Sequence, residues 1–312
     1  MDTVVRTQDL VKDFPTGFLR SRPHRALHGL SLEIAQGGVF GLLGPNGAGK
    51  STTLKILCGL LWPSGGTAEV LGRPAGSLEA HARLGFLPEH PTFYDHLTAE
   101  ELLTYFAGLF GYTSKDKKTR VAAVLDRVGL GTDRRRPIRQ YSKGMVQRVG
   151  LAQAILNEPD LVILDEPMSG LDPIGRREVR ELILELRDEG RTVLFSSHIL
   201  SDAETLCSRV GILVRGRLVR SGAIGELTAE RTRGWEVVAT GLTPDLIEKL
   251  EPRVARLRAI SPGRYAIELE AAERLETFIA EITASGAGLV SVAPAGTTLE
   301  DVFVESVREE QA

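Results

Sequence analysis

The chain has 312 residues, of which 25% are charged, and its formal net charge is only -3. This length allows two domains and a sizeable hydrophobic core. The near balance of charges excludes a strong overall basic field, so nucleic acid is not an expected partner. Cys58 and Cys207 lie far apart in the sequence and have no metal-like spacing, so we expect buried apolar residues in a reducing compartment.

The sequence predicts no membrane-spanning segment. The first ten residues, MDTVVRTQDL, lack the apolar core of a signal peptide. The longest apolar runs, such as Leu161–Leu164 and Val193–Phe195, are far shorter than the roughly 20 residues that a membrane-spanning helix needs. If the protein serves a membrane process, we expect another chain to supply the membrane span.

Residues 1–220 alternate short apolar runs with helical patterns, which predicts an α/β fold with a largely parallel sheet. The first clear unit is a strand at Val39–Leu43, a glycine turn and a helix at Lys50–Leu60. Two later runs, Leu161–Leu164 and Val193–Ser196, predict strands that are buried on both faces.

The stretch from Glu89 to Asn157 has no strong strand signal, and we expect a helical subdomain at about 90–157. The predicted helices are Ala99–Phe110, Lys115–Val128 and Lys143–Leu156.

The composition changes after Ser221, and no phosphate-binding pattern follows. We therefore predict one domain at 1–225 and a small accessory α+β domain at 230–312. Its βαββαβ order suits a ferredoxin-like fold. The predicted elements are strand Trp235–Ala239, helix Pro244–Leu250, strand Val254–Ile260, strand Tyr265–Leu269, helix Ala272–Ser285 and strand Leu289–Val292.

The segment Gly44–Ser51, GPNGAGKS, matches the phosphate-binding P-loop pattern. Its glycines let backbone N–H groups point at phosphates, and the following helix adds its positive end. Lys50 is expected to reach the β- and γ-phosphates, and the Ser51 hydroxyl to ligate Mg²⁺. A chance glycine turn is the alternative, but the pattern arises by chance in roughly one chain in a hundred. The predicted ATP-binding residues here are Gly44, Pro45, Asn46, Gly47, Ala48, Gly49, Lys50, Ser51 and Thr52.

Two acids, Asp165 and Glu166, end the buried strand Leu161–Leu164. Ligands of parallel sheets gather at this edge. We expect Asp165 to hold Mg²⁺ and Glu166 to orient the attacking water. An apolar strand ending in acids is weak evidence alone, but the P-loop strengthens it.

A third motif, Tyr141–Arg148, reads YSKGMVQR and precedes the acidic strand. The Ser142 hydroxyl and the Gly144 N–H, at the start of a helix, suit a γ-phosphate. The alternative is that Ser142 is a plain helix cap.

Taken in order, these motifs resemble the ATP-binding subunits of ABC transporters, and the likeness covers about residues 1–220. YSKGM resembles the ABC signature, with Lys143 and Met145 in place of the commoner Gly and Gln. Ser169–Asp172 resembles the D-loop, and His198, after the strand Val193–Ser197, resembles the switch histidine.

Phe14 and Glu89 are two further candidate site residues. Phe14 is where the family usually stacks an aromatic ring on adenine, although a core phenylalanine is the alternative. Glu89, in GFLPE, occupies the Q-loop position in place of the usual glutamine, and we keep it as a metal contact. Within the family the chain is most similar to ABC-2-type export subunits, through Leu164–Pro173 and Leu299–Phe303.

The resemblance implies a P-loop ABC ATPase domain that uses ATP and Mg²⁺, with catalytic Lys50, Glu166 and His198. It implies a head-to-tail dimer with a second copy or a related subunit, in which Ser142, Gly144 and Asp172 of one subunit face the ATP of the other. It also implies an integral membrane transporter subunit that docks near Glu89–Leu97, and a cytoplasmic location on the inner face of the cell membrane.

Other classes stay open at this point. A soluble ABC ATPase acting on ribosomes or DNA is the main alternative, but such proteins commonly carry two cassettes or a long coiled coil. This chain has one motif set and no sustained heptads. A GTPase is disfavoured because no Asn-Lys-x-Asp motif is present. The cargo stays open among drugs, lipids, polysaccharides and peptides, because cargo contacts belong to the membrane subunit.

Overall fold

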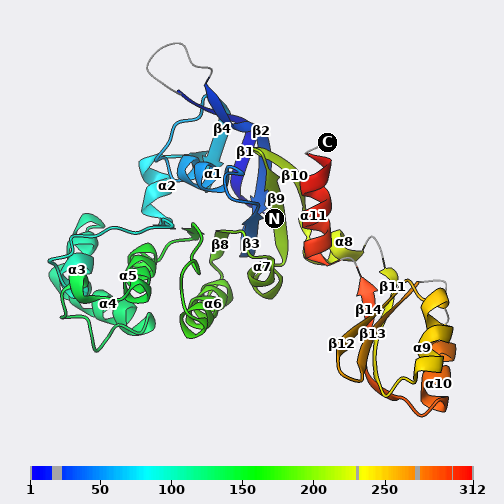
Figure 1. Cartoon of the computed structure of the whole chain (residues 1–312). Coiled ribbons are helices and arrows are strands. Elements are labelled where there is room, and N and C mark those ends of the chain that lie inside the picture. The colour runs from blue at the N-terminus through cyan, green and yellow to red at the C-terminus, as the bar shows by residue number, and fades with distance from the viewer. Residues whose placement is uncertain (1, 16–22, 230–231, 271–274, 297, 311–312) are drawn as a thin grey trace. The chain divides into compact units, whose positions relative to one another are not determined.

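The structure is a computed structural model that describes residues 2–15, 23–229, 232–270, 275–296 and 298–310 (Figure 1). The chain forms two compact units. The first comprises residues 1–224 together with 306–312, and the second comprises residues 225–305. No helix among the described residues is long and apolar enough to cross a bilayer.

A six-stranded, mostly parallel sheet forms the centre of the first unit. Parallel pairing joins neighbouring strands from β6 to β9, whereas β10 pairs antiparallel with β9. The central strands are almost wholly buried, which explains their continuous apolar runs and confirms the predicted parallel sheet. The strand order is β10 (Arg217–Ala223), β9 (Arg209–Val214), β3 (Gly38–Leu43), β8 (Thr192–Ser197), β7 (Leu161–Leu164) and β6 (Leu84–Leu87).

A second, antiparallel sheet of the first unit was not predicted as a sheet. Its order is β2 (His24–Ala35), β1 (Thr3–Phe14), β4 (Gly65–Val70) and β5 (Arg73–Pro74). One hydrophobic core joins the two sheets and helix α1 (Lys50–Leu57). Its fully buried members include Val5, Leu10, Leu27, Leu42, Leu54, Ile163, Leu194 and Leu213.

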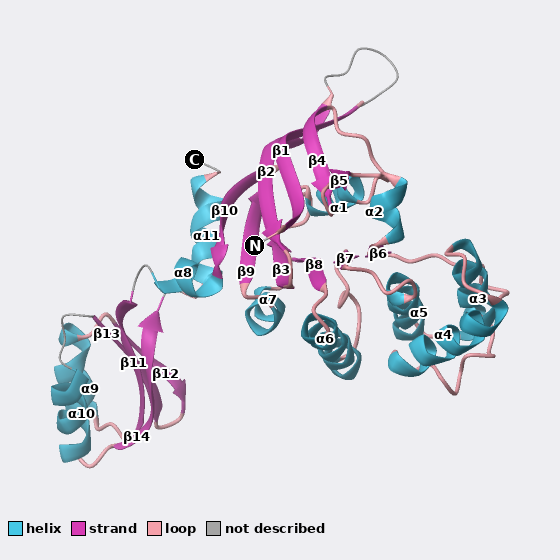
Figure 2. Cartoon of the chain, turned by 180° about the vertical axis from the view of Figure 1, so that it is seen from behind, coloured by secondary structure: helices cyan, strands magenta, loops and turns pink. Residues whose placement is uncertain are grey.

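The predicted helical subdomain is present, and its helices lie together in both views (Figures 1 and 2). The helices begin at hydroxyl caps, and Thr98 forms a capping box with Glu101. Gly85 in β6 lies against α5, and a side chain there would collide with the Ala154 carbonyl oxygen. The elements are α3 (Ala99–Leu109), α4 (Ser114–Arg127), the 3₁₀ turn Ile138–Gln140 and α5 (Lys143–Ile155).

Three further helices lie in the first unit. They are α2 (Leu78–Ala82), α6 (Pro173–Asp188) and α7 (Leu200–Leu206). Helix α1 ends earlier than predicted, because the chain turns after Cys58 through Gly59, whose φ is +66°.

The second unit has the predicted βαββαβ order. Its antiparallel sheet has the order β12-β13-β11-β14, so β13 lies between β11 and β12 as in ferredoxin-like folds. Figure 2 shows α9 and α10 over one face of this sheet, where Phe278 and Ile282 join the core. The elements that lie wholly in this unit are β11 (Thr232–Thr240), α9 (Pro244–Leu250), the 3₁₀ turn Glu251–Arg253, β12 (Arg256–Ser261), β13 (Arg264–Glu270), α10 (Leu275–Ala284) and β14 (Gly288–Gly296). The flanking helices α8 (Ile224–Ala229) and α11 (Leu299–Glu309) begin or end in the first unit. Residues 272–274 of the predicted helix lie outside the described residues.

The predicted second domain, 230–312, reaches further than the second compact unit. From Ser306 onward the end of α11 packs with the first unit. The Arg217 Nε lies 3.4 Å from the Glu310 Oε1, and the Arg220 Nη2 lies 3.4 Å from the Glu309 Oε2. These ion pairs tie the C-terminal turn to β10.

Candidate functional site

The loop between β3 and α1 is closely packed against its neighbours. A side chain at Gly44 would collide with the Leu213 carbonyl oxygen. Gly49 caps α1 at a φ of +104°, and a Cβ there would lie 2.9 Å from the Ala26 carbonyl oxygen. Only glycine fits both positions, so the backbone itself lines the loop, as in loops whose N–H groups bind an anion.

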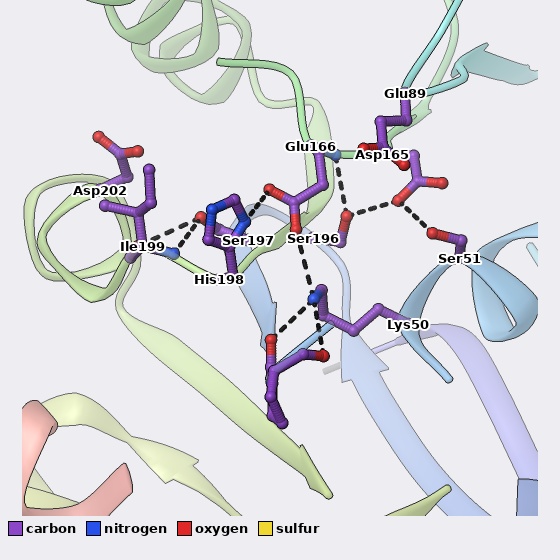
Figure 3. A network of polar contacts seen from close by, with 12 residues as sticks. Lys50, Ser51, Glu89, Asp165, Glu166, Ser196, Ser197, His198, Ile199 and Asp202 are labelled. Carbon is purple, nitrogen blue, oxygen red and sulfur yellow. Dashed lines mark hydrogen bonds and ion pairs between the residues drawn. The ribbon is translucent and has the colours of Figure 1, made fainter. Parts of the chain in front are cut away.

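Lys50 is 6% exposed and is held inside this loop (Figure 3). Its Nζ donates to the carbonyl oxygens of Gly44, at 2.7 Å, and Pro45, at 3.3 Å. It also lies 3.3 Å from the Glu166 Oε1. The buried ammonium is therefore balanced by a buried carboxylate, as burial of a charge requires.

Asp165 is 1% exposed and accepts two hydroxyl hydrogen bonds. The Ser51 Oγ donates to its Oδ1 at 3.0 Å, and the Ser196 Oγ donates to the same atom at 2.7 Å. The Ser196 Oγ in turn accepts from the Glu166 N–H at 2.9 Å. Ser196 thus connects the two acids, although no sequence motif predicted it. The available signal was a serine ending an apolar strand beside the acidic strand.

Glu166 adopts a left-handed backbone conformation with a φ of +48°. For a residue other than glycine this costs roughly 1–2 kcal/mol, and such strain persists only where the surroundings fix it. Three contacts do so: Ser196 at its backbone, Lys50 at one carboxylate oxygen, and His198 at the other. The His198 Nδ1 lies 2.9 Å from the Glu166 Oε2, while 43% of the His198 side chain is exposed.

A cleft of about 360 Å³ opens over these groups. It brings together Phe14, Glu89 and the P-loop, which are far apart in the sequence, and it also includes His24, which no sequence motif predicted. The Lys12 Nζ lies 5.2 Å from the centre of the Phe14 ring. The complete lining is Phe14, His24, Ala26, Asn46, Gly47, Ala48, Gly49, Lys50, Ser51, Thr52, Glu89 and Glu166.

The signature residues lie in a different cleft. Ser142, Gly144 and Asp172 line it together, and the P-loop does not. Ser142 caps α5 by accepting from the Met145 N–H at 3.2 Å, and Asp172 caps α6 by accepting from the Gly175 N–H at 2.9 Å. One chain therefore does not bring the signature to its own P-loop.

Comparison with known proteins places the chain in a family. Residues 27–169 match the family model described as ABC transporter. The chain is 43% identical over 308 residues to an uncharacterized ABC transporter ATP-binding protein of Synechocystis, covering 98% of this chain and 85% of the relative. The chain belongs to the ABC transporter ATP-binding proteins.

Other relatives within this family have more specific names. The bacitracin transport ATP-binding protein BcrA of Bacillus licheniformis is 41% identical over 222 residues, covering 70% of this chain and 69% of the relative. A fluoroquinolones export ATP-binding protein of Mycobacterium tuberculosis is 38% identical over 232 residues, covering 74% of each.

A solved ATP-binding cassette, dimeric in a post-hydrolysis state with ADP and Pi, superposes with a TM-score of 0.64. Its sequence is 25% identical, and the alignment covers 70% of this chain and 98% of the other. As an ABC ATPase, the chain binds ATP and hydrolyses it.

A buried acid links two helices of this ABC ATPase. Asp202, on α7 and four residues after His198, lies 3.5 Å from the Arg176 Nη2 and 3.3 Å from the Arg180 Nη1, both on α6. Helix α6 begins directly after Asp172, and α7 follows His198. The two ion pairs of Asp202 therefore join α6 to α7.

The two cysteines have no place in this chemistry. Burial, together with the negative charge of Asp165, raises the pKa of the Cys58 thiol, and burial raises the pKa of the Cys207 thiol. Both thiols therefore stay protonated at neutral pH and are poor nucleophiles.

Proposed function

We propose that this chain powers transport by closing head to tail on a second ATP-binding subunit, around Mg²⁺-ATP held in the P-loop cleft. The subunit is a second copy or a related chain, and a separate integral membrane protein carries the cargo. The proposal rests chiefly on one arrangement, in which Lys50, Glu166 and His198 form a continuous chain of contacts beside the Ser51–Asp165 pair.

The P-loop contacts support a role for Lys50 in phosphate binding. Its two carbonyl partners are neutral acceptors, and phosphate oxygens would replace them with charged ones. The Glu166 carboxylate, released from Lys50 in this way, is free to accept a proton from a water molecule. His198 is partly exposed and contacts that carboxylate, so it is placed to hold Glu166 in position and to donate to the γ-phosphate.

The donor set of Ser51 and Asp165 fits Mg²⁺. Mg²⁺ prefers oxygen ligands and is commonly held by one or two protein groups plus phosphates and waters. A hydroxyl and a carboxylate that meet at 3.0 Å provide two such groups. When bound, the ion would neutralise charge on the β- and γ-phosphates. Glu89 lines the same cleft and would contact the ion or its waters.

The adenine would stack on Phe14, which lines the cleft at the end of β1. The nearby Lys12 ammonium adds a cation–π contact on this ring.

The separate signature cleft supports a dimer. Ser142 and Gly144 lie at the N-terminal end of α5, which suits a phosphate. The P-loop of the same chain does not line this cleft. A head-to-tail partner would bring its own ATP there, and closing and opening of that dimer is a two-state change that can drive a membrane subunit.

An apolar cleft beside β6 supports a docking place for that membrane subunit. It has a volume of about 300 Å³, and one of its lining residues is Phe86, three residues before Glu89. Leu109 and Phe110 also line it, and Tyr94, which is 64% exposed, lies in the segment Glu89–Leu97 that we expect to contact the partner. We further propose that the chain is held at the inner face of the cell membrane through this contact and that the transport is ABC-2-type export.

Two variants of the purified full-length chain test the catalytic assignment. Glu166→Gln should bind ATP normally, hydrolyse it about 10²–10⁴-fold more slowly, and accumulate as an ATP-dependent dimer on size-exclusion chromatography. Lys50→Ala should instead lose nucleotide binding in calorimetry. Turnover of Glu166→Gln close to that of the wild type would remove Glu166 from the mechanism.

A further inference from the structure

The position of the His198 ring depends mainly on the backbone around it. In the described part of the chain the ring has one polar partner, the Glu166 carboxylate at 2.9 Å. Directly after it, the Ile199 N–H donates to the Ser197 Oγ at 2.9 Å, and that hydroxyl donates to the Ile199 carbonyl oxygen at 3.2 Å (Figure 3). Helix α7 then begins at Leu200, and its N-cap Ile199 has no side-chain cap. The imidazole therefore stays against Glu166 only if the start of α7 is held in place.

Asp202 is the side chain that holds the start of α7 on α6. It lies in the first turn of α7 and is only 2% exposed. Its Oδ1 accepts from the Arg180 Nη1 at 3.3 Å, and its Oδ2 lies 3.5 Å from the Arg176 Nη2. A carboxylate buried this deeply needs opposite charge beside it. The two guanidinium groups supply that charge, so they fix α7 against α6.

Helix α6 is the firmer of the two helices. It has 16 residues, and its buried face includes Leu182, Ile183 and Leu186. Helix α7 has only seven residues. Ion pairs between them therefore restrain the short helix, and with it the segment that carries His198.

The link is not the arrangement that stability alone favours. On the Arg176 side the ion pair is not also a hydrogen bond, because the Asp202 Oδ2 and the Arg176 Nε are both buried without a hydrogen-bond partner among the described residues. Such atoms are rare in native proteins, and an apolar residue often serves stability as well as a buried ion pair. Local rules of stability are typically broken at functional sites. The place of this charge, one turn after His198, points to a functional reason for it.

We propose that Asp202 is a positioning residue for ATP hydrolysis, because its ion pairs with α6 hold the His198 imidazole against the Glu166 carboxylate. The inference rests on the catalytic roles of His198 and Glu166 proposed above and extends them. Asp202 does not line the nucleotide cleft, so it acts on turnover and not on ATP affinity. A misplacement of about 1 Å at a reacting group can slow a reaction roughly 10²-fold.

The first test is Asp202→Asn in the full-length chain, which keeps the size of the side chain and removes its charge. We expect kcat to fall about ten- to a hundredfold, with an unchanged Kd for ATP in calorimetry, both measured well below the unfolding midpoint. The matched control is Asp188→Asn, the same change at an exposed acid of α6 that pairs with Arg187. This control should match the wild type in both quantities.

The second test asks whether Asp202 acts through His198. Single-turnover phosphate release is compared for Asp202→Asn, His198→Ala and the double variant. A residue that only places the imidazole has nothing left to place once the imidazole is gone, whereas independent effects multiply. We therefore expect the double variant to release phosphate at the rate of His198→Ala alone.

A second pair of variants applies if Asp202→Asn does not fold. Arg176→Gln and Arg180→Gln each remove one ion pair from the partly exposed side of the link, where the arginine side chains are 30% and 32% exposed. Each should lower kcat severalfold with an unchanged Kd for ATP. That loss should again disappear in the His198→Ala chain.

Each outcome decides a different statement. Near wild-type kcat in Asp202→Asn, or in both arginine variants where they replace it, overturns the role of Asp202 and leaves the proposed function intact. A double variant slowed by the product of the two single effects does the same. Near wild-type turnover of His198→Ala overturns the catalytic role of His198 itself, and this inference with it.

Discussion

Replacing Ser196 with alanine should lower both the stability of the first unit and the rate of ATP hydrolysis, although no sequence motif marks this residue. The hydroxyl is fully buried, accepts from the Glu166 N–H and donates to Asp165. Its loss leaves a buried N–H without a partner, at a cost of about 1–3 kcal/mol. It also removes one of two hydroxyl donors from a buried carboxylate, worth about 1.5–3 kcal/mol.

These two costs overlap because they share one hydroxyl, so we expect a net loss of about 2–4 kcal/mol. For a unit of this size each kcal/mol lowers the melting midpoint by about 2–4 °C, which gives a drop of roughly 5–15 °C. Because Glu166 is held in a left-handed conformation partly by this contact, turnover should also fall by about ten- to a hundredfold.

The assay is thermal unfolding with and without ATP, because the transition that ATP raises reports the first unit. Ser201→Ala, on the exposed side of α7, makes the same chemical change without a buried contact and should leave both midpoint and turnover unchanged. A Ser196→Ala melting midpoint within about 1 °C of that of the wild type would show that these hydrogen bonds do not contribute the stability assigned to them.

Three further changes test separate parts of the structure. Gly44→Ala should destabilise the first unit by about 1–3 kcal/mol, because the added Cβ collides with the Leu213 carbonyl oxygen. The same variant should show no ATP binding in calorimetry. The control Gly225→Ala, whose Cβ would meet open space, should show neither effect. Glu89 lines the cleft and begins the segment Glu89–Leu97 that we expect to contact the membrane partner, so it could relay Mg²⁺-ATP binding to that partner. Glu89→Ala should then keep ATP affinity but lose stimulation of hydrolysis by the reconstituted membrane partner, while Glu89→Gln should retain it; equal stimulation in the alanine variant and the wild type would exclude this relay. A chain ended at residue 305 should bind ATP normally but should unfold at a lower ATP-shifted midpoint, since it loses the buried Ser306 as well as surface ion pairs worth about 0–1 kcal/mol each; a folded fragment that fails to bind ATP would contradict this.

The sequence by itself determined the nucleotide chemistry and most helices and strands. The P-loop is a contiguous segment in which positions such as Gly44 and Gly49 accept only glycine. Its residues could therefore be recognised without knowing which residues pack against them in space. The strands β3, β7 and β8 were equally clear, because burial on both faces leaves a continuous apolar run. The βαββαβ order of the second unit followed from local periodicity in the same way.

Tertiary structure alone decided the features that depend on distant partners. Ser196 meets Asp165 because the parallel pairing of β7 with β8 aligns residues 31 positions apart, and no local pattern encodes that register. The antiparallel β1–β2–β4 sheet likewise exists through pairings between separate segments. The end of α11 belongs with the first unit because its glutamates meet arginines of β10, roughly 90 residues earlier, and charge patterns do not say which partner they will find.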